Sequence, residues 1–377
     1  MKASYVLSNT SRILTPALLI YPERIQSNIE ITVKLLGNDV CRWRPHIKTA
    51  KLQYVIKMLV ARGIKTLKCA TSLELTTAIA AGATDILVAH TPAGANAVRI
   101  CQVAKSFPRV SISVLVDSPG QIEQWRGSQL GIFIDINPGM NRTGADPANI
   151  PALLRLACAV HRARLCVLGL HYYDGHLSSL SMAKRNKTAH AGYRQLLAAA
   201  KALQEHVADK IEIVTAGTPS FPCTLTFPAF SDSRFLHRAS PGTVVYCDGI
   251  TMRQLPKSYG YRPAVLVLSR VISHPNRQIF TCDAGHKTIS ADSGIPNCAV
   301  VDMDHLHPLR PSEEHLPIEF AANSRQPAFG QSLYLIPEHV CPTVNNFDHA
   351  LIVQNGKVQR VEPVTARGRE APLLREN

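Results

Sequence analysis

Short apolar runs alternate with segments of helical periodicity over the first two thirds of the chain. Leu14–Tyr21 is an apolar run typical of a strand, and the residues from Pro22 to Gly37 carry apolar side chains at the spacing of one helix face. Further strand-like runs cover residues 41–48, 63–71, 85–90, 110–117, 131–137, 165–172, 211–215 and 242–247. Strands that alternate with helices in this way predict a (β/α)8 TIM-like barrel rather than an open doubly wound sheet.

The pattern changes near residue 249, where short strands punctuated by proline and glycine replace the alternation. The strand-like runs there cover residues 264–272, 278–282, 299–301, 332–336 and 351–358. This spacing indicates a second, mostly β domain. Because Met1–Leu14 contains a strand-like stretch ahead of the barrel, we assign residues 15–249 to the barrel, and residues 1–14 with 250–377 to the β-strand domain.

Composition narrows the class of protein. No apolar run approaches the ~18 residues that a membrane span requires, and the polar N-terminus lacks a signal-peptide pattern. The ten cysteines form no CxxC pair and lie mostly in apolar stretches, so we expect reduced thiols in a cytoplasmic protein. The net charge of +14 is spread along the chain and aromatic residues make up only 6%, so we expect neither a nucleic-acid partner nor a membrane partner.

Barrel enzymes carry their chemistry at the carboxyl ends of the strands, and the predicted second strand ends in a lysine. Arg44, His46 and Lys48 alternate along this strand and so share a face. A lysine on an inward face is a candidate for Schiff-base chemistry, whereas a lysine at the strand mouth would only be solvated. From the residues alone, we give equal weight to a Schiff-base lysine and a solvated lysine. Lys51 is the rival candidate, but the face shared with His46 favours Lys48.

Two later strand ends are also rich in polar groups. Arg142 stands in a turn between two glycines, so its guanidinium either reaches into the barrel mouth to meet a carboxylate or phenolate, or caps the next helix. The strand ending near residue 172 runs into Tyr172 and Tyr173, with His171 and His176 beside them. One of these rings either stacks on a flat cofactor or lies at the barrel rim. Chemistry alone does not rank the two histidines.

Glycine- and hydroxyl-containing loops, Ala216–Ser220 and Ser240–Thr243, flank the last predicted barrel strands. Such loops suit a phosphate bound by backbone N–H groups. In the second domain, His339 and Cys341 are two residues apart and would share a face in an extended segment. Imidazole with thiolate favours zinc, although an isolated pair of this kind is more often a buried cysteine beside a histidine at the rim.

Taken together, these motifs resemble the D-threonine aldolase and D-serine dehydratase family. Its members have the alanine-racemase-type fold, in which a barrel that binds pyridoxal 5′-phosphate (PLP) is joined to a β domain. The matching segments occur in family order between residues 15 and 348. They are Arg44–Thr49, Gly139–Gly144, Ala216–Pro219, Ser240–Thr243, Asp283–Lys287 and Pro337–Thr343.

The resemblance implies roles for individual residues. Lys48 would form the Schiff base with PLP, Arg142 would face the phenolic oxygen, and Tyr173 would lie against the pyridine ring. The phosphate would be held by Gly217, Thr218, Gly242 and Thr243. His339 and Cys341 would bind a divalent metal, with zinc expected before manganese or magnesium.

Two positions depart from related patterns. Alanine racemases have an arginine at the pyridine nitrogen where this chain has Ser240, and a hydroxyl cannot impose the same positive field. The aldolase branch typically has aspartate where this chain has Cys341, and the dehydratase branch has cysteine. The residues that follow, 344–348, favour the aldolase.

We therefore expect a PLP- and metal-dependent lyase that cleaves D-3-hydroxy amino acids to glycine and an aldehyde, as D-threonine aldolase does. The first alternative is a D-serine or 3-hydroxy-D-aspartate dehydratase, which yields a 2-oxo acid and ammonia. An amino-acid racemase and a non-catalytic PLP carrier follow, although such carriers lack a second domain and a metal motif. The resemblance also implies a homodimer and leaves the general base open between Lys48 and a histidine.

Overall fold

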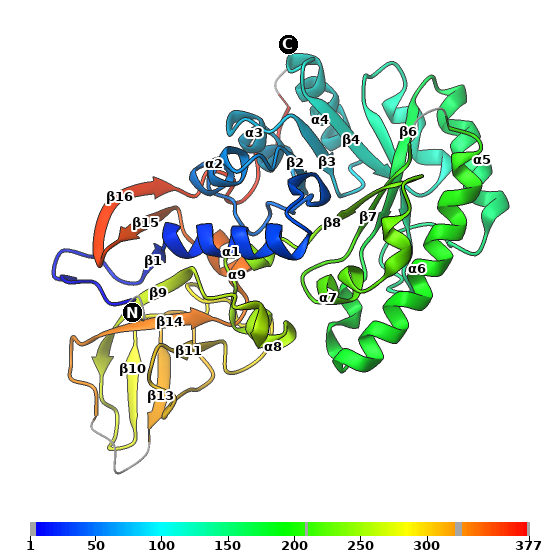
Figure 1. Cartoon of the computed structure of the whole chain (residues 1–377). Helices are drawn as coiled ribbons and strands as arrows, with labels where there is room; N and C mark the ends of the chain where they lie inside the picture. Colours follow the sequence, from blue (N-terminus) through cyan, green and yellow to red (C-terminus); the bar gives the residue numbers. More distant parts are fainter. Residues whose placement is uncertain (1–4, 208–209, 321–325, 375–377) are drawn as a thin grey trace. The chain divides into compact units, whose positions relative to one another are not determined.

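The computed structural model describes residues 5–207, 210–320 and 326–374, which divide into two compact units (Figure 1). The strand unit comprises Met1–Thr32, Thr49–Val55 and Thr243–Gly368. The barrel unit comprises Val33–Lys48, Ile56–Gly242 and Arg369–Asn377. Among the described residues, no helix combines the length and the apolar character needed to cross a membrane.

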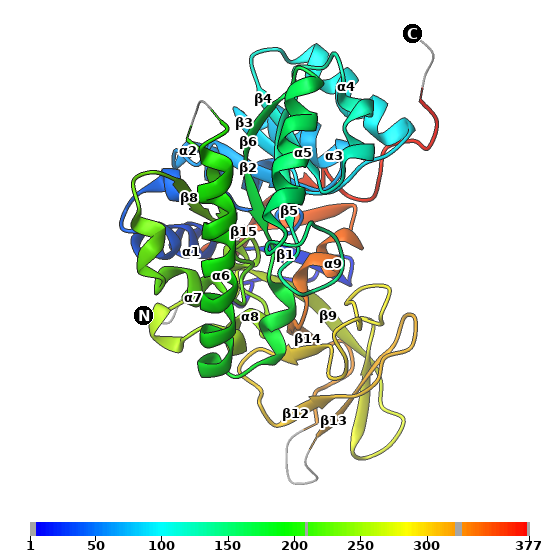
Figure 2. The same cartoon turned by 90° about the vertical axis from the view of Figure 1, so that its right-hand side faces the viewer.

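Parallel strands in sequential order form the centre of the barrel unit. They are β2 (Thr66–Cys69), β3 (Asp85–Val88), β4 (Ser111–Val116), β5 (Gly131–Ile136), β6 (Cys166–Tyr172), β7 (Glu212–Thr215) and β8 (Leu236–Ala239). The connecting helices are α3 (Ser72–Ala80), α4 (Ala95–Ser106), α5 (Ile150–Arg162), α6 (Met182–Gln204) and α7 (Phe221–Leu225). Figure 2 shows α5 and α6 side by side along the strands. The buried residues of α5 recur every three to four positions, as one helix face requires.

An extended segment closes this sheet into a ring. Trp43 forms a parallel bridge with Ala239 of β8, and His46 forms one with Lys68 of β2, so the segment joins both edge strands. Pro45 lies between the two bridges and has no N–H to donate, which interrupts the ladder. The predicted barrel is therefore confirmed, with an extended segment in place of a regular strand at the eighth position.

A mixed sheet forms the strand unit, which confirms the mostly β second part. Its strands are β1 (Ala17–Ile20), β9 (Val265–Ser273), β10 (Ile279–Cys282), β11 (Cys298–Val300), β12 (Leu306–Pro308), β13 (Leu316–Phe320), β14 (Ser332–Pro337), β15 (His349–Gln354) and β16 (Lys357–Pro363). Helices α8 (Gly249–Gln254) and α9 (Val340–Asn345) lie within this unit, and α1 (Pro22–Leu35) and α2 (Gln53–Ala61) span the division between the units.

Two of the predicted barrel strands are not part of the barrel sheet. β1 is a strand, but it pairs antiparallel with β9 and parallel with β15, in the sheet of the strand unit. All its residues are buried, and an apolar run buried on both faces fits the middle of either sheet. The run at 242–247 forms a 3-10 turn at Thr243–Val245, followed by Cys247 at a φ of 54°. The domain boundaries at residues 15 and 249 remain a prediction.

Candidate active site

A cavity of about 300 Å³ lies at the carboxyl ends of the barrel strands, and three residues predicted from the sequence line it. Lys48 and Arg142 both approach the ring of Tyr173. The Lys48 Nζ is 5.9 Å from the ring centroid, and the Arg142 Cζ is 4.9 Å from it. The cavity therefore combines an amine, a guanidinium and a flat aromatic ring.

The loop that carries Arg142 is held by its own polar groups. The Asn137 Oδ1 accepts hydrogen bonds from backbone N–H groups within the loop, and the Gly144 N–H donates to the Asp117 carboxylate at 3.0 Å. Gly144 has a φ of +104°, and a Cβ there would lie 2.4 Å from the Asn137 nitrogen. Asn149 caps the following helix, so Arg142 is not needed for that role.

A buried hydrogen-bonded chain lies behind this loop. The Lys68 Nζ is 3.2 Å from the His171 Nε2, and the His171 Nδ1 is 2.7 Å from the Asp135 Oδ1. The Thr143 hydroxyl donates to the other Asp135 oxygen at 2.7 Å. This arrangement decides between the two histidines, since His171 lines the cavity and His176 is not among its lining residues.

Burial and charge shift the pKa values along this chain. Burial and the charges of Lys48, Arg44 and Arg142 together lower the pKa of Lys68 to about 7, against the opposing effect of Asp135. Burial and Lys68 also lower the pKa of His171. A neutral His171 then donates from Nδ1 to Asp135 and accepts at Nε2. Lys68 was not predicted from the sequence. The available signal was a lysine inside the apolar run 63–71.

In the two predicted phosphate loops, the backbone at a glycine comes so close to a neighbouring residue that no side chain would fit there. A Cβ on Gly217 would lie 2.7 Å from the Tyr173 ring, and one on Gly242 would lie 2.5 Å from the His46 carbonyl oxygen. The Gly217 N–H bonds to the carboxylate of Asp174, so the contribution of this glycine is space. Neither glycine is among the cavity's lining residues, but both contact residues that are. Thr218 is buried and Thr243 belongs to the strand unit.

The lysine that rivals Lys48 in the sequence is engaged elsewhere. The Lys51 Nζ donates to the Ala366 carbonyl within the strand unit, and Lys51 does not line the cavity. The Ser240 hydroxyl donates to the Arg44 carbonyl at 2.6 Å, so it supports the closing segment. The structure thus brings together Lys48, Arg142 and Tyr173.

The predicted metal pair lies in the strand unit at the start of α9. His339 precedes the helix and Cys341 is in its first turn, so the two are not both extended, yet their side chains form a hydrogen bond. The His339 Nδ1 is 2.7 Å from the Asp292 Oδ2, and the Cys341 Sγ is 3.0 Å from the Thr49 Oγ1. Burial lowers the pKa of His339, but its bonds to Cys341 and Asp292 outweigh this and raise it to about 9.

This donor set matches part of a metal site. A thiol and an imidazole side by side are the donors that zinc prefers. Within the described part of the chain, no group of three or more histidine, cysteine, aspartate or glutamate side chains is arranged to hold a metal. The protein side of such a site therefore consists of two donors, with Asp292 on the far nitrogen of His339.

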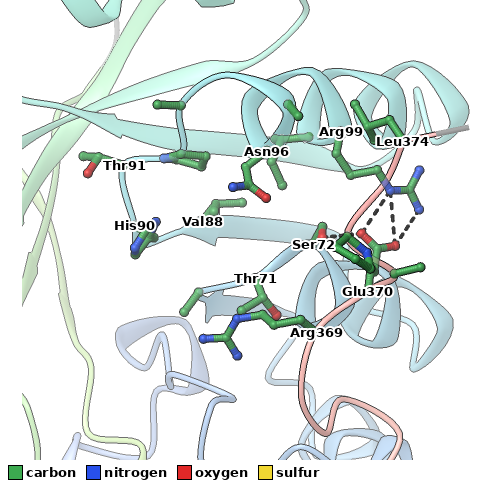
Figure 3. Close-up of a pocket in the computed structure, with 17 residues that line it drawn as sticks. Thr71, Ser72, Val88, His90, Thr91, Asn96, Arg99, Arg369, Glu370 and Leu374 are labelled. Atoms are coloured by element: carbon green, nitrogen blue, oxygen red, sulfur yellow. Dashed lines mark hydrogen bonds and ion pairs between the residues drawn. The ribbon is translucent and has the colours of Figure 1, made fainter.

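A second cavity of about 680 Å³ shares lining residues with the first, namely Ala70, His90 and Thr91. The loops after β2 and β3 form one side, and residues 369–374 form the other (Figure 3). Glu370 fixes this C-terminal segment, because its carboxylate accepts hydrogen bonds from the Arg99 guanidinium, at 2.7 Å from Nη2, and from the Ser72 hydroxyl. No motif in the sequence predicts this cavity.

With this geometry established, the comparisons with known proteins identify the family. Residues 20–248 match the family described as alanine racemase, N-terminal domain. The chain belongs to the alanine racemase N-terminal domain family. Residues 264–353 of this family member also match the family described as putative serine dehydratase domain. The predicted family resemblance and fold are thereby confirmed.

Full-length relatives of this alanine racemase family member carry out two reactions. A 3-hydroxy-D-aspartate aldolase from Paracoccus denitrificans (strain Pd 1222) is 28% identical, with 95% of this chain and 93% of the relative covered. A D-threo-3-hydroxyaspartate dehydratase from Delftia sp. (strain HT23) is 24% identical, with 92% and 96% covered. The crystal structure of D-threonine aldolase from Filomicrobium marinum superposes with a TM-score of 0.85 at 26% identity, covering 97% of this chain and 99% of that one.

Proposed function

We propose that the protein is a PLP- and divalent-metal-dependent lyase that cleaves D-3-hydroxy amino acids, as D-threonine aldolase does. The observation that carries this proposal is the convergence of Lys48, Arg142 and Tyr173 on one cavity. The full-length similarity to aldolases supports the same class of reaction. The substrate would be a small D-amino acid with a hydroxyl group on its β-carbon.

The residues of the cavity fit PLP. Lys48 would bind the aldehyde carbon, Tyr173 would cover the pyridine ring, and Arg142 would face the phenolic oxygen. When bound, PLP withdraws electrons from the α-carbon of an attached amino acid. A side chain on Gly217 would displace the Tyr173 ring, so Gly217 allows this ring to stay where the pyridine ring of PLP would lie against it. The phosphate is proposed to lie at Gly217, Thr218, Gly242 and Thr243, where Gly217 contributes space because its own N–H donates to Asp174.

The residues of the strand unit fit a metal ion, held by His339 and Cys341. Thiolate and imidazole favour zinc over manganese or magnesium, which prefer oxygen donors. A metal ion lowers the pKa of a hydroxyl group that binds to it. In the proposed reaction the β-hydroxyl loses its proton as the bond between the α- and β-carbons breaks, and the α-carbon gains one proton. The products are glycine and an aldehyde.

The second candidate is a dehydratase, and the observation that favours it is Cys341 in place of an aspartate. In that reaction the α-carbon loses a proton and the β-hydroxyl leaves as water, and hydrolysis of the resulting enamine, through its imine form, by one water molecule gives a 2-oxo acid and ammonia. Both reactions need the same PLP cavity, so only the products separate them. A homodimer and a cytoplasmic location remain predictions.

The first test is reaction of the PLP-loaded protein with borohydride, followed by peptide mapping. We expect the modified lysine to be Lys48, because its amine lies over the Tyr173 ring. Lys68 is the internal comparison, since it is the other lysine among the lining residues. Modification of Lys68, or no modification at all, would overturn the assigned role of Lys48. Lys48→Ala should lose the visible absorbance of lysine-bound PLP.

The second test is product analysis with D-threonine, D-serine and D-3-hydroxyaspartate. Glycine with an aldehyde supports the aldolase, and a 2-oxo acid with ammonia supports the dehydratase. Exchange of the α-proton for deuterium without either set of products would indicate a racemase. PLP-loaded protein that is inert on all three substrates would contradict both lyase proposals.

A further inference from the structure

Lys68 is a buried amine in the cofactor cavity for which the proposed reaction has no use. It lies on β2, its exposed fraction is 2%, and it lines the same cavity as Lys48. Its hydrogen-bond partner is the His171 Nε2, which accepts when His171 is neutral and donates from Nδ1 to Asp135. Burial of an ammonium group costs several kcal/mol unless opposite charge compensates it.

The charges around Lys68 explain why its neutral form is stable in the absence of a ligand. Lys48 and Arg142 approach it from two loops, and Asp135 of β5 provides the opposing charge. Arg44 is also near, but its guanidinium is paired with Asp85 and Glu212. The other titratable residues that line the cavity are His46, His90, His171 and Tyr173. A charged Lys68 would thus make three cations against one carboxylate.

We infer that Lys68 is the proton acceptor of this cavity, and that its amine takes up a proton when an anionic ligand binds there. This inference rests on the proposed function, because PLP is the anion that the cavity is proposed to hold. An entering phosphate and phenolic oxygen reverse the balance of charge that disfavours the ammonium form. The proton comes from solvent, the amine becomes an ammonium group, and His171 keeps its proton on Nδ1.

Proton uptake by Lys68 determines how the affinity for the anion changes with pH. Burial and the neighbouring cations lower the pKa of Lys68 to about 7 before a ligand binds, so the amine is already charged well below pH 7 and no uptake occurs there. Above pH 7 the amine is neutral before binding and charged afterwards, until the pH exceeds its raised pKa in the complex. Affinity for the anion therefore falls as pH rises through this window, by up to about tenfold per pH unit for one full proton.

Calorimetry with pyridoxine 5′-phosphate tests the inference without covalent chemistry, because this probe carries the phosphate and phenol but no aldehyde. Binding to the purified protein is measured near pH 8 in two buffers with different ionisation enthalpies, which gives the number of protons taken up. We expect Lys68→Met to take up roughly half to one proton fewer than the wild type. The matched control is Lys51→Met, a buried lysine outside the cavity, which should equal the wild type.

The possible outcomes separate the two proposals. If the probe and PLP both fail to bind the wild type, the proposed function fails. If the probe binds and Lys68→Met takes up as many protons as the wild type, the role of Lys68 is overturned. Should Lys68→Met not fold, the wild type alone decides, because its uptake must disappear as the pH is lowered well below 7. Uptake that persists there would contradict the inference.

Discussion

At the scale of single residues, the two nitrogens of His339 have different surroundings. The Nδ1 is 2.7 Å from the Asp292 Oδ2, and the other oxygen of that carboxylate accepts a hydrogen bond from the Ser290 hydroxyl at 2.8 Å. A carboxylate on Nδ1 fixes the ring orientation and leaves Nε2 for a metal. Asp292 is therefore a positioning residue for the proposed metal site.

We expect Asp292→Ala to weaken zinc binding by roughly 10- to 100-fold, because loss of a carboxylate behind a metal-binding histidine has this effect. The measurement is competition with a chromophoric zinc chelator. Asp292→Asn should bind more tightly than Asp292→Ala, since the amide oxygen still accepts from Nδ1–H. Asp304→Ala, at an exposed aspartate, is the control. Equal zinc affinity in Asp292→Ala and the wild type would contradict this role.

Residue chemistry alone located part of the site. Lys48 and Arg142, which line the candidate site, were predicted because Lys48 ends a predicted strand, Arg142 follows another, and each carries a charge that a barrel mouth can use. Lys68 was missed because β2 reads as an ordinary apolar run, and nothing local shows which neighbours a buried lysine will meet. Its partners, His171 and Asp135, come from β6 and β5, which are far away in the sequence.

At the scale of elements, ionic contacts hold the segment that closes the barrel. The Arg44 Nε is 2.7 Å from the Glu212 Oε1, and its Nη2 is 2.6 Å from the Asp85 Oδ2. These two carboxylates belong to the first residues of β7 and β3, so the network lies at the amino ends of the strands. The cavity lies at the carboxyl ends of the strands. The residues that stabilise the barrel and the residues proposed to take part in the reaction are therefore at opposite ends of the strands.

Arg44→Met should lower the free energy of unfolding by up to roughly 3–5 kcal/mol, because the buried Glu212 then keeps only its ion pair with Arg238 and the partly exposed Asp85 loses its bidentate bond. Urea denaturation gives this free energy. If its dependence on urea concentration is the same in the variant and the wild type, the two unfolded states are comparable. Adding Asp85→Asn should restore part of the stability, since it removes the negative charge of the carboxylate that loses its bidentate bond from Arg44. A loss below about 1 kcal/mol for Arg44→Met, the range of an exposed pair, would rule out this role.

Periodicity predicted the elements better than their pairing. The apolar runs located β2 through β7, but no predicted run covers β8 (Leu236–Ala239), and the run expected at 242–247 forms a 3-10 turn instead. Periodicity could not place β1, which is buried on both faces and would fit either sheet. It also overstated the regularity of the closing segment, where Pro45 cannot donate to a ladder. Pairing depends on long-range contacts that local patterns do not encode.

At the scale of the whole chain, the C-terminal segment returns to the barrel unit after the last strand. Residues 369–374 lie along the cavity of about 680 Å³, and Glu370 holds them through Arg99 and Ser72 (Figure 3). His90 and Thr91 line both this cavity and the cavity of about 300 Å³ that contains Lys48. The segment is therefore a wall of the space next to the proposed site.

Glu370→Gln should release this segment, because the amide cannot replace the charge-assisted bonds from Arg99. Arg99 and Glu370 are partly exposed, at 33% and 27%, so the ion pair contributes on the order of 0.5–1 kcal/mol. This corresponds to roughly a two- to fivefold faster cleavage by trypsin after Arg369 under conditions in which segment opening is fast. Glu362→Gln removes a comparable exposed pair on β16 and serves as the control. If both variants are cleaved at the wild-type rate, Glu370 does not hold the segment, and the wall of the second cavity is fixed by its other contacts.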